Sequence, residues 1–252
     1  MNVDCHVGVD RERFPVERAL EILARSGVQR AVIFTDAHST EPDKQNEYVL
    51  QQAKERDLYP FFYIGGNPYT DTRPDALTLP DNLPDFAGIR WHRWIGEGID
   101  REGRMDRDEL DWAINLMESA DFEAVVSAAA HYAMPIMVEE SLAVTVEFAL
   151  RYPSLDIIVP HMGARSGGEA NVLRALWDAP NVYFDTSLSH LDETALARLG
   201  TERIFYGSGF PEGDPEHELG KIDRLPVPED VKEGIYGDNV VSLLAGYALV
   251  EG

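Results

Sequence analysis

The sequence has few of several residue types, and each shortage excludes a class of protein. Its 252 residues include one cysteine, Cys5, so no disulfide can form within the chain and no cysteine cluster can hold zinc. Lysine occurs only four times, the acidic residues number 45, and the formal net charge is −23. Because nucleic acids and anionic membrane surfaces attract positive charge, we expect neither as a partner.

Long apolar runs and targeting features are also missing. No apolar stretch approaches the roughly 20 residues that cross a bilayer, and the start MNVDCHVGVDRERF lacks the basic and apolar parts of a signal peptide. We therefore expect a cytoplasmic protein with a reduced cysteine. The acidic residues concentrate in the expected helices and loops, which resembles adaptation to a salt-rich, halophilic cytoplasm where screening relieves self-repulsion.

Eight apolar segments of strand length alternate with helical patterns. The expected strands are 2–8, 30–36, 58–65, 86–93, 135–141, 155–162, 181–187 and 203–209. The expected helices are 15–27, 41–57, 108–133, 142–152, 168–178, 190–199 and 214–224, followed by one or two closing helices in 228–249. This alternation over about 250 residues predicts one (β/α)8 barrel domain, an α/β fold that spans residues 1–252. An open doubly wound sheet is less favoured, because no G-x-G-x-x-G turn follows the first strand.

Polar side chains gather where these strands end, which is the edge where barrel enzymes carry their chemistry. His6, His92 and His161 lie at or near strand ends, and Glu139 ends the fifth strand. Imidazole and carboxylate groups that converge on one barrel mouth suit zinc, manganese or iron better than calcium. A structural alternative for Glu139 is a rim carboxylate paired with an arginine such as Arg90.

Strand alternation and composition refine this picture. Asp4 is expected to share a face with His6, whereas Cys5 points to the other face and packs against a helix. Arg90 and His92 share a face and could hold a substrate carboxylate. Trp91 and Trp94 either pack under the helix layer or stack on a planar substrate, and segment 95–107 is expected to be a mobile flap. Acids at the rim, Asp185, Glu212 and Asp214, argue against a phosphate site.

Several segments resemble, in order, the motifs of the amidohydrolase-2 family, which comprises metal-dependent hydrolases and decarboxylases on a (β/α)8 barrel. The segments are VDCHVGVD, SGVQRAVIF, GIRWH, PIMVEES, RYPSLDIIVPHMG, NVYFDTS, RIFYGSGFPEGDPEHEL and EGIYGDNVVSLL. They cover nearly the whole chain. The resemblance implies the barrel fold, a divalent metal and a small-molecule substrate.

The chain departs from the family pattern at most of the metal-ligand positions. The resemblance implies two histidines after the first strand, a histidine ending the fifth strand and an aspartate ending the eighth. Here these positions hold His6, Gly8, Glu139 and Gly209. Some decarboxylase branches use a carboxylate and one histidine after the first strand, a pattern that Asp4 and His6 match.

Three interpretations follow, and whether the chain is an enzyme stays open among them. In the first, His6, Glu139 and His161, with Asp4 as a further ligand, hold one divalent metal for hydrolysis or decarboxylation of a small carboxylated or lactone-like substrate. In the second, no metal is bound, and His161 acts as general acid or base with Glu139 as its partner. In the third, the barrel is inactive and binds a ligand or regulates another protein. A homo-oligomer is compatible with each, although the sequence specifies no dimer face.

Overall fold

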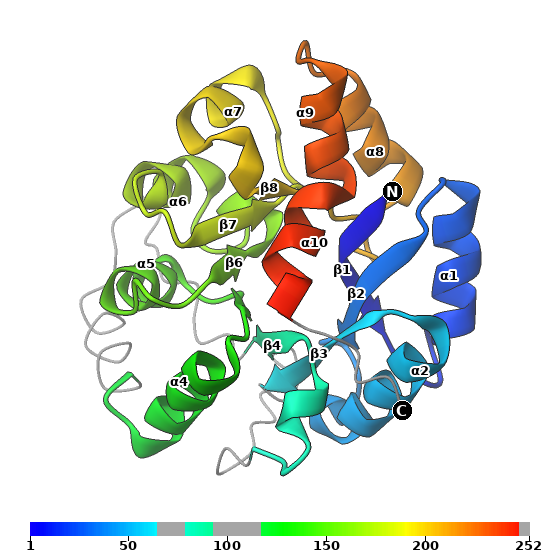
Figure 1. Ribbon diagram of the computed structural model, residues 1–252, viewed down its shortest axis with the longest axis vertical. Coiled ribbons are helices and arrows are strands. Elements are labelled where there is room, and N and C mark those ends of the chain that lie inside the picture. The colour runs from blue at the N-terminus through cyan, green and yellow to red at the C-terminus, as the bar shows by residue number, and fades with distance from the viewer. Residues whose placement is uncertain (65–78, 93–116, 247–252) are drawn as a thin grey trace.

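The computed structural model describes residues 1–64, 79–92 and 117–246, which contain an eight-stranded parallel sheet in the order β1 to β8 (Figure 1). The strands are Val3–Val9, Arg30–Thr35, Tyr59–Ile64, Gly88–Trp91, Ile136–Val138, Ile157–Val159, Val182–Asp185 and Ile204–Phe205. The amide of Cys5 donates to the carbonyl of Tyr206 at 2.9 Å, and the amide of Gly8 donates to the carbonyl of Phe210 at 2.7 Å. These bonds join β8 to β1, so the predicted barrel is confirmed.

The helices surround the barrel and follow the predicted order (Figure 1). They are α1 (Val16–Arg25), α2 (Asn46–Arg56), α4 (Ala120–Tyr132), α5 (Leu142–Arg151), α6 (Glu169–Leu176), α7 (Glu193–Leu199), α8 (Pro215–Asp223), α9 (Glu229–Glu233) and α10 (Asn239–Leu243). Short turns include η3 (Pro160–Gly163) after β6 and the π-helical η5 (Gly234–Asp238) between α9 and α10. Trp94, the expected flap 95–107 and the first part of the expected helix 108–133 lie outside the described residues. No described helix has the length and apolar character that crossing a bilayer requires.

Two apolar layers arise from the alternating faces of the strands. The outer layer packs strand residues such as Ile33 and Ile157 against the helices. The inner cluster fills the barrel with Val3, Cys5, Val32, Phe34, Tyr59, Phe61, Ala87, Met137, Ile158, Phe205, Val240 and Leu244. Because Val240 and Leu244 come from the closing segment, α10 covers one end of the barrel (Figure 1). The polar strand ends lie at the opposite end.

The expected alternation of β1 is wrong at its centre. The register against β2 shifts between Asp4 and Val7, and Cys5 belongs to the inner cluster while Val7 belongs to the outer layer. The shift places both Cys5 and His6 toward the barrel, and Asp4 no longer shares a face with His6. Cys5 is fully buried, and burial raises the pKa of its thiol well above the ordinary value. It is therefore a packing residue, although inside the barrel rather than against a helix.

Candidate functional site

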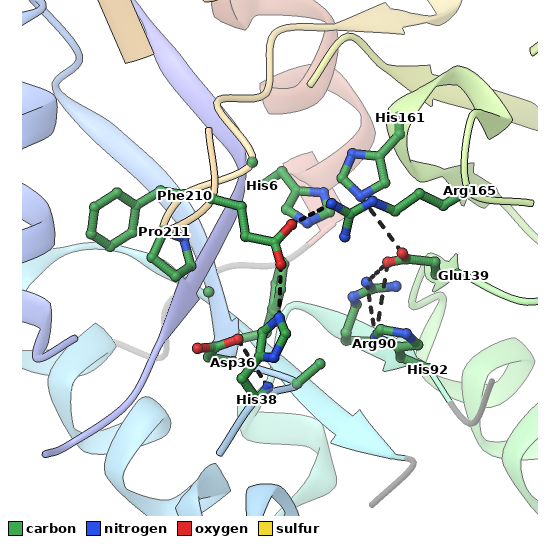
Figure 2. Close-up of a pocket in the computed structure, with 15 residues that line it drawn as sticks. His6, Asp36, His38, Arg90, His92, Glu139, His161, Arg165, Phe210 and Pro211 are labelled. Carbon is green, nitrogen blue, oxygen red and sulfur yellow. Dashed lines mark hydrogen bonds and ion pairs between the residues drawn. The ribbon is translucent and has the colours of Figure 1, made fainter. Parts of the chain in front are cut away.

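A pocket of about 40 Å³ opens at the carboxyl ends of the strands (Figure 2). Its volume is far below the roughly 300 Å³ of a typical small-molecule site. The described lining comes from β1, β2 and β4 and from the segments that follow β2, β4, β5, β6 and β8. It comprises His6, Gly8, Phe34, Asp36, Ala37, His38, Arg90, His92, Glu139, His161, Arg165, Gly209, Phe210, Pro211 and Glu212.

Asp185, at the end of β7, connects two histidines below this pocket. Its Oδ2 accepts a hydrogen bond from Nδ1 of His6 at 2.9 Å, and its Oδ1 accepts from the amide of His161 at 3.1 Å. The amide of Ser187 adds a bond to Oδ1 at 3.0 Å, and the Ser187 hydroxyl also donates to that oxygen. Burial opposes ionisation of Asp185, but His6 and these hydrogen bonds hold its pKa below the ordinary value.

These contacts fix which nitrogen of each imidazole carries the proton. Nδ1 of His161 lies 3.1 Å from the carbonyl oxygen of Ser187, and a carbonyl can only accept, so Nδ1 is the donor. The ionised Asp185 assigns the same role to Nδ1 of His6. Burial lowers the pKa of His161 to about 4, so the ring is neutral at neutral pH and its Nε2 keeps a lone pair. Figure 2 shows the two rings side by side, with centroids 4.7 Å apart.

Glu139 forms a buried ion pair with Arg90, whose Nη2 donates to Oε2 of the carboxylate. Its Oε1 lies 3.7 Å from Nε2 of His161, and its Oε2 lies 3.9 Å from Nδ1 of His92. Burial opposes ionisation of Glu139, but His92 and Arg90 hold its pKa well below the ordinary value. Burial lowers the pKa of His92 to about 3. The charges at the pocket floor therefore cancel between one carboxylate and one guanidinium.

The structure brings together most of the residues singled out from the sequence. His6, Arg90, His92, Glu139 and His161 all line the pocket. The pairing of Glu139 with an arginine, weighed as a structural alternative, is present. His161 and Glu139 lie within ion-pair distance but do not form a hydrogen bond.

Other sequence candidates lie elsewhere. Asp4 does not line the pocket; its Oδ1 accepts from the amides of His6 and Ser208, each at 2.9 Å. Burial raises the pKa of Asp4 to about 6. Trp91 packs in the outer layer, and its indole nitrogen donates to Glu140 at 2.9 Å. Asp185 has a role that the sequence does not predict: its position at the end of the seventh strand indicates only an acid at the rim, whereas in the structure it holds His6 and His161.

A side chain at either glycine of the expected ligand positions, Gly8 or Gly209, would be crowded. A Cβ on Gly8 would lie 3.2 Å from the carbonyl oxygen of Phe210 and 3.4 Å from Cδ of Pro211. Gly209 has φ +67, in the left-handed region, and a Cβ there would lie 3.1 Å from Cγ of Leu188. The loop after β8 therefore fills the space beside Gly8, and its backbone favours glycine at position 209.

The donors suit a transition metal better than calcium. Among the described residues, His6, His161 and Asp185 form a group whose ligand atoms all lie within 4.8 Å of one another. Glu139 and Asp4 do not belong to that group. Both oxygens of Asp185 already accept hydrogen bonds, so its present role is to orient the two histidines. Two imidazoles with a carboxylate nearby are a donor set that fits manganese, zinc or iron.

The fold and the histidines and carboxylates at its strand ends define a TIM-barrel protein with a candidate metal centre. The family model described as Amidohydrolase matches residues 3–244, and the chain belongs to this amidohydrolase-2 family. A comparison with curated proteins finds no match.

Solved structures share the barrel at low sequence identity. A dihydroxybenzoic acid decarboxylase from Polaromonas sp. JS666, solved with manganese and the inhibitor 2-nitroresorcinol, has TM-score 0.66 and 12% identity, covering 100% of this chain and 99% of that chain. A 2,6-dihydroxybenzoate decarboxylase from Rhizobium has TM-score 0.64 and 13% identity, covering 97% and 98%. A putative 2-pyrone-4,6-dicarboxylic acid hydrolase from Pseudomonas putida has TM-score 0.62 and 14% identity, covering 98% of both chains. At these identities the likeness establishes the fold.

Proposed function

We propose that this protein is a metal-dependent hydrolase or decarboxylase of a small carboxylated or lactone-like molecule, with a metal site rebuilt around His6 and His161. The observation that carries the proposal is that both imidazoles are protonated on Nδ1. Each donates its Nδ1 proton, His6 to Asp185 and His161 to Ser187, and each retains Nε2 as a free ligand atom. Metal-binding histidines have this arrangement, in which a carboxylate or carbonyl accepts from the other ring nitrogen.

His6 and His161 would hold the ion through Nε2, and the third ligand would be Glu139, whose Oε1 lies 3.7 Å from Nε2 of His161. A divalent ion bound there supplies a Lewis acid that polarises a carbonyl or carboxylate of the substrate. Asp185 keeps the His6 imidazole in the ligating tautomer, and Ser187 does the same for His161. Arg90 balances the charge of Glu139, and its Nε has no hydrogen-bond partner among the described residues. We therefore assign substrate orientation to Arg90 together with His92.

The names of the structural neighbours support the substrate class. The two decarboxylases act on dihydroxybenzoates, and the putative hydrolase is named for a pyrone dicarboxylic acid. All of these molecules are small, planar and carboxylated. A hydrolase and a decarboxylase therefore remain the two activities to test.

Elemental analysis tests the metal site. Full-length protein purified without chelator should contain close to one manganese, zinc or iron per chain. His6→Ala and His161→Ala should each lower the occupancy by about tenfold or more. His190→Ala is the matched control, because its side chain is 97% exposed and is not among the described residues that line the pocket. Wild-type protein with less than about a tenth of a metal per chain would contradict the proposal.

Turnover tests the activity. Protein reconstituted with manganese or zinc should release CO2 from a dihydroxybenzoate or open a carboxylated pyrone, and His161→Ala should abolish this. If the protein binds metal but turns over none of a panel of such acids, the proposed enzymatic activity is rejected and the proposed metal site is retained.

A ligand-binding barrel without catalysis is the second candidate. It is favoured by the Arg90–Glu139 pair, which already neutralises the pocket floor, and by the packing that would crowd a side chain at Gly8 or Gly209. Such a protein would bind a small carboxylate in the absence of metal and leave it unchanged. Calorimetry on chelator-treated protein, combined with product analysis, separates the two candidates.

A further inference from the structure

A carboxylate of the protein itself lies at the mouth of the pocket between two donors. Oε1 of Glu212 lies 2.7 Å from Nε2 of His38, and its Oε2 accepts from Nη2 of Arg165. His38 and Arg165 reach toward the pocket from different loops (Figure 2). The three side chains are 33%, 34% and 35% exposed for His38, Glu212 and Arg165, so solvent reaches this bridge.

The backbone holds the donors without help from the Glu212 carboxylate. The carbonyl of His38 accepts from Nη1 of Arg13 at 2.9 Å, and the amide of His38 donates to Oδ1 of Asp36 at 3.1 Å. Arg165 lies two residues after the turn η3, which follows β6. The backbone of each donor is therefore positioned independently of the Glu212 carboxylate.

A tight turn places the Glu212 carboxylate between these donors. The carbonyl of Gly209 accepts from the amides of Glu212 at 3.0 Å and Gly213 at 2.9 Å. This turn uses the left-handed conformation of Gly209. Gly209 stands where the family resemblance implies an aspartate ligand. Here the turn at Gly209 instead places the carboxylate of Glu212 at the mouth of the pocket.

We infer that His38 and Arg165 form a binding site for a substrate carboxylate, that Glu212 occupies this site as an internal ligand, and that the substrate displaces Glu212. The inference rests on the carboxylated substrate class proposed above. A planar guanidinium with a second donor is the arrangement that recognises a carboxylate group. Burial opposes ionisation of Glu212, but His38 and Arg165 hold its pKa below the ordinary value, so it competes as an anion.

The small size of the pocket supports such a displacement. Its volume of about 40 Å³ accommodates little more than water. A benzoate-sized molecule needs more room, and the half-exposed Glu212 side chain lines the opening. When an internal ligand occupies a site, only the molecules whose site is vacant can bind an external ligand. The apparent affinity for the external ligand is therefore the intrinsic affinity multiplied by the vacant fraction. Removing the carboxylate should therefore strengthen binding of an external carboxylate.

Binding of benzoate to full-length protein, measured by isothermal titration calorimetry, tests the inference. Glu212→Ala should bind benzoate about tenfold more tightly than wild type, and Glu212→Gln should show part of this gain. Benzamide, which has the same shape without the charge, should bind both proteins equally. Glu147→Ala is the matched control: its carboxylate is also 34% exposed and is paired with Arg151 on the surface of α5.

Two double variants identify the donors. Adding Arg165→Ala or His38→Ala to Glu212→Ala should remove the tenfold gain. Circular dichroism should show that the Glu212→Ala variant is folded. If the folded variant binds benzoate no more tightly than wild type, or does not bind it, the inference is overturned. The readout is affinity, so a protein that shows the gain but has no metal or turnover rejects only the proposed enzyme. Turnover of a carboxylated substrate with no gain in Glu212→Ala rejects only the internal ligand.

Discussion

One buried carboxylate organises the two central histidines. Asp185 is fully buried, and each of its oxygens accepts from a different histidine, Oδ2 from a ring and Oδ1 from a backbone amide. Its charge decides which nitrogen of His6 is protonated. The ligand atoms offered to the pocket are therefore set by a residue that does not line it.

Asp185→Asn should destabilise the fold and reverse the tautomer of His6. The amide nitrogen of asparagine would face the Nδ1 proton of His6, so two donors would oppose each other. We expect the free energy of unfolding to fall by about 2–3 kcal/mol, the worth of a buried hydrogen bond to a charged group. Urea denaturation measures this loss, and long-range proton–nitrogen NMR reports the protonated nitrogen.

Asp81→Asn, at an exposed position, controls for the loss of a negative charge. It should change the free energy of unfolding by less than about 0.5 kcal/mol. If Asp185→Asn were equally neutral, the hydrogen bonds of Asp185 would not hold the site.

Asp36, at the end of β2, should give the opposite result. Its Oδ2 has no hydrogen-bond partner among the described residues, and burial raises the pKa of its carboxyl. Ionised Asp36 therefore opposes folding at pH values above its folded pKa, and this penalty disappears as the pH falls through that value. Asp36→Asn should stabilise the protein at pH 8 and by less at about pH 3, below the ordinary pKa of an aspartate. Urea denaturation at both pH values checks this, and an equal gain at both would refute the ionisation argument.

At the scale of elements, the strands were predictable because each is a continuous apolar run between turn residues. Parallel strands buried on both faces give this signal in the sequence itself. The alternation within β1 was not predictable, because a register shift between Asp4 and Val7 depends on how β2 pairs with it. That shift reverses the faces of Asp4 and Cys5.

The site was predictable to the same extent. His6, His92, Glu139 and His161 were found because strand ends meet at one edge of a barrel. Arg90 was expected as a partner of Glu139, but the histidine partners of Asp185 could not be read from spacing, because they lie 179 and 24 residues away in the sequence. The role of Glu212 depends on a turn at Gly209 that the sequence presents only as a missing aspartate.

Packing between β3 and β4 offers an element-scale prediction. A Cβ on Gly88 would lie 2.6 Å from Cζ of Phe61, a fully buried ring inside the barrel. Gly88→Ala should lower the free energy of unfolding by about 1–3 kcal/mol through overpacking. Phe61→Leu in the same chain should recover part of this loss, giving a favourable coupling in a double-mutant cycle. If urea denaturation shows that the two losses in free energy of unfolding are additive, the Phe61 ring is not what clashes with the methyl group that Gly88→Ala adds.

At the scale of the whole molecule, the net charge of −23 acts on stability. Between 0.1 and 1 M salt the screening length falls from about 10 Å to about 3 Å, which weakens repulsion between surface acids. We expect the melting temperature to rise by about 5 °C or more between 0.1 and 2 M KCl. An equal rise in sucrose of matched osmolality would attribute the effect to solute exclusion instead of charge screening.

The packing of α10 against one end of the barrel has a consequence for folding during translation. Val240 and Leu244 fill the barrel beside Val3 and Cys5, and a Cβ on Gly237 would lie 2.1 Å from the carbonyl oxygen of Met1. The first strand leaves the ribosome long before the segment that covers it is synthesised. Throughout that interval β1 has neither its β8 neighbour nor its apolar cover, so the barrel cannot close before the segment that contains α10 has been synthesised.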